Sequence, residues 1–225
     1  MTMKKISVIC LFLLSLFLSS CFEVVEDMKV AKDGSGSMTL TVNFSQSRTK
    51  LAAIMMMDTI NGHKVPERQD IQLEIDKLVT RLNSTPGISN AKGNVDFTSF
   101  IAIISFSFRD VANVNRAISN IMDQYKVKGM SAASYSYNEA EGRFSRVYKN
   151  TGDVREQYNK LRDRDKEIFS SAMYISIFRF ENTITDYSNK LSRVAKNQLA
   201  IMQRCSVKDL INGRTDISNQ IQLSK

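Results

Sequence analysis

The chain has 225 residues and a formal net charge of +8, with one histidine and three cysteines. So few imidazoles and thiols exclude a metal centre built from a cluster of histidine and cysteine ligands. Acidic and basic residues are interspersed through most of the sequence, so the positive balance indicates solubility, with affinity for an anionic partner as the alternative.

The first predicted element is a leader. Lys4 and Lys5 precede the thirteen-residue apolar run Ile6–Leu18, and the small residues Ser19 and Ser20 follow it. A short basic head, an apolar stretch of roughly 7–15 residues and small residues at its end are typical of a secretory signal peptide. A transmembrane helix needs about 20 apolar residues, so this run is too short for that interpretation.

A cysteine ends the leader. Leu18-Ser19-Ser20-Cys21 resembles the lipobox of bacterial lipoproteins, in which leucine and two small residues precede an obligatory cysteine. The resemblance implies that residues 1–20 are a lipoprotein signal peptide, that diacylglycerol is joined to the Cys21 thiol, and that the new amine takes an acyl group such as palmitate. Cys21 is therefore the one predicted site residue, a lipidation site. The alternative is a cysteine that merely follows a leader.

The predicted anchor indicates a location. One acyl chain holds a protein at a bilayer only marginally, whereas two or more hold it stably. We therefore expect the body to be bound through Cys21 to a membrane of the bacterial cell envelope. In lipoproteins of Gram-negative bacteria, an aspartate after the cysteine favours retention in the inner membrane. Phe22 occupies that position here, which favours the outer membrane.

Removal of the leader leaves 205 residues, enough for one large domain or two small ones, with a charge of about +6. The expected partners are envelope proteins or anionic envelope polymers; neither nucleic acid nor a cofactor is expected. With Cys21 lipidated, Cys205 is the remaining thiol of the mature chain, so no internal disulfide is predicted. Its apolar neighbours, Leu199–Met202, favour a buried, inert thiol.

The body is predicted to begin with a β-hairpin. Residues 22–30 are rich in apolar side chains, those of 38–44 alternate strictly, and the turn cluster Lys32–Gly36 separates the two ranges. Alternation with a period of two is typical of a half-buried strand, and Asp-Gly is a strong hairpin signal.

Helical spacing predicts three helices in the next part of the chain, the first starting after Ser45 or Ser47, the second over 71–82 and the third over 111–125. Residues 88–108 are predicted strands, of which 100–108 has the composition of a central strand partly covered on both sides. The adjacent Met55-Met56-Met57 favours core or partner packing over a Cu(I) site, because neighbouring helical residues point about 100° apart.

The last third mixes strands with charged helical material. Residues 153–169 are dense in charges of both signs and indicate a solvated helix, with a partner-docking element as the alternative. The other predicted elements are a hairpin over 134–149, strands over 173–180, around 194, over 199–204 and over 217–223, and a helical turn over 206–210.

These elements predict an α+β fold with antiparallel sheets and amphipathic helices packed on one face, and two related halves are an option. The first α+β domain or half spans 21–125. The second spans 134–225, with 153–169 as a charged excursion, and the suggested break lies near 126–133.

No enzyme is predicted, and no catalytic residue is assigned. The sequence lacks the Gly-x-Ser-x-Gly, phosphate-loop and dinucleotide-binding motifs. His63 and Cys205 could form a Cys–His nucleophile only in contact, and their flanking residues do not support that.

Two carboxylate pairs could in principle act on a glycan. Asp163/Asp165 and Glu139/Glu141 lie in polar segments, however, where nothing would separate the pKa values of an acid and a base. The predicted function is therefore that of a membrane-anchored envelope lipoprotein that binds or scaffolds. The alternative is a lipid- or glycan-binding carrier, or a cell-wall-acting enzyme, with a groove between sheet and helices.

Overall fold

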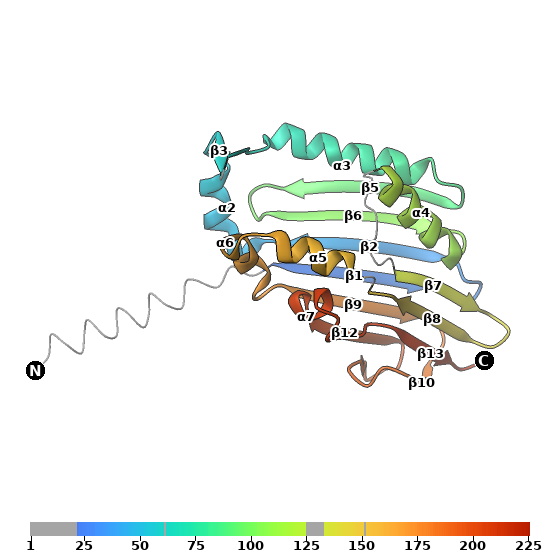
Figure 1. Ribbon diagram of the computed structural model, residues 1–225. Coiled ribbons are helices and arrows are strands. Elements are labelled where there is room, and N and C mark those ends of the chain that lie inside the picture. The colour runs from blue at the N-terminus through green and yellow to red at the C-terminus, as the bar shows by residue number, and fades with distance from the viewer. Residues whose placement is uncertain (1–21, 61, 125–132, 151) are drawn as a thin grey trace, which may run out of the picture.

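The computed structural model describes residues 22–60, 62–124, 133–150 and 152–225 (Figure 1). The predicted leader, the predicted lipidation site Cys21 and residues 126–132 of the suggested break lie outside this part of the chain. Within it the fold is α+β with mostly antiparallel sheets, as predicted.

The larger of two extended sheets, here called the main sheet, has the strand order β11-β12-β9-β1-β2-β6-β5 among the described residues. Neighbouring strands are antiparallel except β1 and β9, which pair in parallel from Glu23↔Met173 to Val30↔Phe180. Its strands are β1 (Glu23–Val30), β2 (Gly36–Asn43), β5 (Ile88–Asp96), β6 (Ile101–Phe108), β9 (Met173–Phe180), β11 (Arg193–Val194) and β12 (Ala200–Ser206).

A second sheet, here called the small sheet, packs against one face of the main sheet. The ring centroid of Phe144 on β8 lies 5.0 Å from that of Phe178 and 5.3 Å from that of Phe180, both on β9. In the described ranges its order is β10-β13-β8-β7. The strands are β7 (Ala133–Asn138), β8 (Arg143–Tyr148), β10 (Ile184–Tyr187) and β13 (Asn219–Leu223); β3 (Thr59–Ile60) and β4 (His63–Lys64) form a separate short pair.

Helices lie above and to the left of the small sheet, on the same side of the main sheet (Figure 1). The α4 helix begins after Asp110, whose carboxylate accepts a hydrogen bond from the Ala112 N–H at 2.7 Å, and it buries Val111, Val114 and Ala117. This three-residue spacing places the buried side chains on one helical face. The described helices are α2 (Arg48–Ile54), α3 (Arg68–Asn83), α4 (Val111–Gln124), α5 (Asp153–Lys160), α6 (Asp163–Lys166) and α7 (Val207–Ile211), with 3₁₀ turns at Ser45–Ser47 and Glu167–Phe169.

Close packing of α3 on β5 depends on a missing side chain. A Cβ atom added to Gly93 would lie 2.4 Å from Cγ2 of Ile75 and 2.9 Å from Cγ2 of Val79. The glycine therefore lets the apolar face of α3 lie directly on the strand.

Most elements predicted from periodicity are confirmed. The N-terminal hairpin is β1 and β2, the helix predicted over 71–82 is α3, and the strand predicted over 173–180 is β9. The strand predicted over 100–108 is β6, which lies between β2 and the edge strand β5; its outer face is half-buried apart from Ile103, which is 40% exposed.

Strands from both predicted halves share the main sheet. β9 and β12 of the second half add to the hairpin of the first half, and buried side chains of both halves form one hydrophobic cluster. The suggested break near 126–133 therefore does not separate one sheet from another. Within the described ranges, no helix has the length and apolar character needed to cross a bilayer.

Candidate functional site

The most unusual polar group of the interior is a carboxylate in the middle of β1. Glu26, Met28 and Val30 are buried, and they alternate with more exposed residues along the strand. Because side chains of a strand alternate between its two faces, this register forces Glu26 into the space between the main and small sheets. Glu26 pairs with Ser176 of β9 and with Leu40 of β2.

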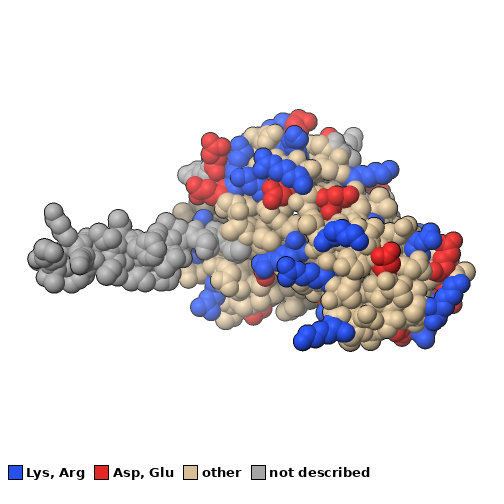
Figure 2. All heavy atoms as spheres, turned by 90° about the horizontal axis from the view of Figure 1, so that it is seen from below, with Lys and Arg blue, Asp and Glu red and all other residues tan. Residues whose placement is uncertain are grey.

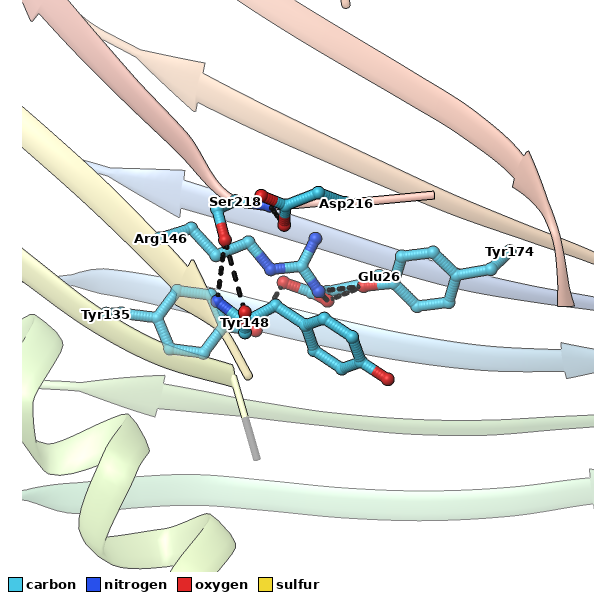
Figure 3. Close-up of polar contacts among 7 residues, drawn as sticks. All are labelled: Glu26, Tyr135, Arg146, Tyr148, Tyr174, Asp216 and Ser218. Carbon is cyan, nitrogen blue, oxygen red and sulfur yellow. Dashed lines mark hydrogen bonds and ion pairs between the residues drawn. The ribbon is translucent and has the colours of Figure 1, made fainter. Parts of the chain in front are cut away.

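Arg146 of β8 enters the same space from the small sheet. Its Nη2 atom lies 3.1 Å from Oε2 of Glu26, and the two side chains are only 2% and 5% exposed (Figure 3). Burial of an ion pair is costly unless the charges are close and further hydrogen bonds satisfy them. The pair joins the two sheets through charge rather than through apolar contact alone.

Two tyrosines complete the coordination of the carboxylate. The Tyr135 hydroxyl donates to Oε1 of Glu26 at 2.7 Å, and the Tyr174 hydroxyl donates to Oε2. Burial, followed by the negative charge of Glu26, raises the pKa of both tyrosines well above the usual value of 10. Both hydroxyls therefore stay protonated at neutral pH and act as donors.

Aromatic rings enclose the guanidinium group. The Cζ atom of Arg146 lies 5.9 Å from the ring centroid of Tyr135, 5.2 Å from that of Tyr174 and 5.8 Å from that of Phe178. Such distances allow cation–π attraction. Burial alone would lower the pKa of Arg146, but the charge of Glu26 and the tyrosine hydroxyls outweigh it and raise the pKa, so the guanidinium remains charged.

Part of this polar cluster has no partner. Three atoms, Arg146 Nε, Arg146 Nη1 and Ser176 Oγ, are buried and have no hydrogen bond within the described residues.

A separate set of hydrogen bonds joins β8 to the residues before β13. The Tyr148 N–H donates to Oγ of Ser218 at 3.0 Å, and the Ser218 N–H donates to Oδ1 of Asp216 at 2.8 Å (Figure 3).

The geometry of the Glu26–Arg146 cluster suits a structural role. Its two charged side chains are nearly inaccessible, so a solute has no direct route to either charge. Within the described ranges, no group of three or more histidine, cysteine, aspartate or glutamate side chains is placed to hold a metal ion. We therefore describe this cluster as the polar core that holds the two sheets in register.

The residue that follows the predicted lipidation site is fixed in the fold. The Phe22 ring packs against Phe44, at a centroid distance of 5.2 Å, and against Phe169, at 5.9 Å. Its carbonyl oxygen accepts a hydrogen bond from the Met173 N–H at 3.0 Å. The first described residue is therefore already held by ring packing and by a backbone hydrogen bond.

The carboxylates considered from the sequence lie at the surface and are mostly in ion pairs. On α6, Asp163 contacts Lys166 at 3.2 Å, and Asp165 contacts Arg162 at 2.7 Å.

The other pair, Glu139 and Glu141, lies at the β7–β8 turn. The Glu141 carboxylate contacts Arg143 of β8 at 3.0 Å.

The two residues considered for a Cys–His nucleophile lie on different elements. His63 is exposed on β4, whereas Cys205 is buried on β12, where burial raises the pKa of its thiol. The prediction that Cys205 is buried is confirmed. The prediction of core packing for the methionine triplet is wrong for Met56 and Met57, whose side chains are 89% and 51% exposed.

The polar core itself was missed at the sequence level. The available signal was Glu26, a charge on the apolar face of an alternating strand. Its partner Arg146 is 120 positions away and has no local mark of its role.

The fold has a weak likeness to a solved structure. No family model and no curated protein matches the sequence. The folded domain of LppM from Mycobacterium tuberculosis, determined by NMR, matches with a TM-score of 0.48 and 9% identity, over 90% of this chain and 88% of that chain. A likeness at this level leaves the function to be inferred from the residues of this chain.

Proposed function

We propose that the protein is a lipid-anchored component of the bacterial envelope that works by binding or scaffolding. The single observation that supports this most directly is the sequence Leu18-Ser19-Ser20-Cys21, followed at once by a folded strand. Acyl groups on Cys21 would attach the membrane to the main sheet almost without a tether.

The position of β1 makes such an anchor mechanically firm. This strand lies inside the main sheet, between β9 and β2, and Phe22 before it is packed in an aromatic cluster. A pull on Cys21 would therefore be carried by hydrogen bonds to both neighbouring strands. Phe22 in place of aspartate favours the outer membrane as the location.

A binding role is supported by the open face of the main sheet, which faces away from the small sheet and the helices. Strand register places Arg204, Ile175, Val25, Thr41 and Ile103 side by side across five strands on this face. None of these side chains is classed as buried, and they mix aliphatic with polar groups. A surface of this kind suits contact with another macromolecule.

The anchor is tested by Cys21→Ser in the full-length chain, with Cys10→Ser as the matched control because it removes a leader thiol and leaves the lipobox intact. Metabolic labelling with an alkyne fatty acid should modify the wild type and the control and leave Cys21→Ser unlabelled. Cys21→Ser should also be released from membranes by a carbonate wash. Retention and correct cleavage of Cys21→Ser would contradict the proposal.

Binding through the open face is tested by photo-crosslinking in intact cells. A photoreactive amino acid at Thr41 or Ile103 should give a discrete crosslinked product, whereas the same residue at Leu73, exposed on α3, serves as the control. Equal labelling from both positions would indicate no preferred surface.

A further inference from the structure

One long segment of the chain contains basic residues without a single acidic one. Between Asp186 and Asp209 the sequence carries five lysines and arginines and neither aspartate nor glutamate. All five basic side chains are exposed; they are Lys190, Arg193, Lys196, Arg204 and Lys208. Other stretches of the sequence also lack acidic residues, but none of them carries as many basic ones.

The segment forms the β11–β12 edge of the main sheet and the loop that leads into it. Figure 2 views the molecule from below and shows basic and acidic side chains among a largely uncharged surface. Charges on an edge strand also prevent two molecules of the protein from pairing edge to edge. Prevention of such pairing does not require apolar side chains beside the charges.

Apolar side chains are in fact present beside these charges. A surface hollow of about 460 Å³, here called the edge hollow, is lined by Met173, Leu191, Arg193, Met202 and Arg204. Leu191 is 59% exposed and Met202 is 38% exposed. The hollow thus combines two guanidinium groups with aliphatic and thioether side chains that water solvates poorly.

The basic side chains in and near the edge hollow differ in how free their charges are to contact a ligand. Arg204 contacts Glu23 at 3.3 Å, with 54% of its side chain exposed, so its charge is partly compensated. Lys190 lies over the ring of Tyr187, with Nζ 5.4 Å from the centroid. Lys190 precedes the exposed Leu191 directly, and Arg193 follows it by two residues.

The edge hollow lies beside the start of the fold. Met173, one of its lining residues, donates its N–H to the carbonyl oxygen of Phe22 at 3.0 Å. Cys21 is one residue farther, about 3.8 Å from Cα to Cα. A lipid anchor at Cys21 would therefore hold the edge hollow close to the bilayer surface.

We propose that the edge hollow docks on the anionic phospholipid surface to which the protein is tethered, with Lys190, Arg193 and Arg204 facing lipid phosphates and Leu191 dipping among the acyl chains. This inference rests on the proposed function, because the anchor supplies the proximity. The docked edge would fix the orientation of the body, which an anchor alone leaves free to rotate. Each basic side chain near an anionic surface multiplies membrane affinity about fivefold.

The test uses the full protein, purified in mild detergent from the producing cells and reconstituted with vesicles of phosphatidylcholine alone or with phosphatidylglycerol added. An environment-sensitive fluorophore is attached at Leu191→Cys. The control position is Leu73→Cys, exposed on α3. Cys205→Ala is included in both so that labelling is confined to the chosen position.

Docking predicts that the probe at position 191 emits at shorter wavelength on phosphatidylglycerol vesicles and that the emission of the probe at 73 does not change. About 1 M salt, which reduces the screening length to roughly 3 Å, should reverse the shift without releasing the protein. The pair Lys190→Gln and Arg193→Gln should lower the docking equilibrium constant by about 25-fold. The matched pair Arg81→Gln and Lys92→Gln should not change it.

The outcomes separate this inference from the anchor. The docking is overturned if the vesicles carry the protein but the probe at 191 stays in water, or if its emission shifts equally on neutral vesicles. Either result leaves the anchor supported. Flotation that is lost in high salt supports the docking and contradicts the anchor. Absence of flotation under every condition overturns both.

Discussion

Arg146 and Glu26, which are 120 residues apart in sequence, meet at 3.1 Å in the space between the two sheets and form their buried ionic connection. The carboxylate also accepts hydrogen bonds from Tyr135 and Tyr174. Four side chains from β1, β7, β8 and β9 therefore depend on one another, and this dependence can be measured.

Removal of one partner of this pair should be costly. Glu26→Gln leaves the Arg146 charge buried without compensation, and we expect it to lower the free energy of unfolding by about 3–5 kcal/mol. Glu26→Leu combined with Arg146→Met should recover most of this loss, since both charges are then absent. Urea denaturation measures each value.

The matched control for this experiment is the surface pair Arg179–Asp27, at 2.8 Å and partly exposed. Arg179→Gln should change the free energy of unfolding by no more than about 1 kcal/mol. An equal effect of Glu26→Gln and Arg179→Gln would show that the buried pair carries no special weight.

The raised pKa values of Tyr135 and Tyr174 predict a loss of stability at alkaline pH. The folded protein holds both hydroxyl protons more tightly than the unfolded chain, whose tyrosine pKa is about 10. Their contribution is therefore complete below pH 10 and is lost as the pH rises toward the folded-state values. We expect urea midpoints to fall above pH 10.

The double variant Tyr135→Phe and Tyr174→Phe separates this effect from general alkaline denaturation. It should be less stable than wild type at pH 8, because Glu26 loses two donors, and should lose less stability between pH 8 and 11.5. Parallel profiles for the two proteins would rule out these tyrosines as the source.

The first hairpin should be intolerant of a single methyl group. A Cβ atom added to Gly36 would lie 1.9 Å from the Lys29 carbonyl oxygen and 2.7 Å from Cζ of Phe108. We expect Gly36→Ala to cost about 3 kcal/mol of unfolding free energy, at the upper end for overpacking. Gly152→Ala has open space around it and only an unfavourable φ of 85°, so a cost of about 1 kcal/mol is expected. Thermal denaturation of both variants checks the difference.

The Cys205 thiol should react slowly in the folded protein, because it is buried and burial raises its pKa. In a chain with Cys10→Ser and Cys21→Ser, a thiol reagent should modify Cys205 only after addition of denaturant. Adding Leu191→Cys to this chain should introduce one fast-reacting thiol. Rapid modification of Cys205 in the native protein would contradict its burial.

Local pattern predicted the secondary structure well, because it reports directly on which face of an element is buried. The strand β9 and the helix α4 each carry an apolar stripe of the correct period, so their existence followed from the sequence. The strand β10 was missed, since Ile184–Tyr187 is short and two of its residues are exposed polar ones.

Long-range pairing could not be read in this way. Nothing in the sequence of β1 selects β9 as its second neighbour, because both strands present apolar side chains that would fit several partners. The same limit hid the polar core. Glu26 is visible as an exception to the alternation of β1, but the choice of Arg146 depends on how the small sheet lies across the main sheet.

The parallel pairing of β1 with β9 also constrains how the chain is made. β2 follows β1 almost at once, whereas 148 residues separate Glu26 from Tyr174, its contact on β9. During synthesis one side of β1 therefore stays open until most of the polypeptide has emerged. Exposed strand edges of this kind invite mispairing, and the main sheet cannot be completed until the last third of the chain arrives.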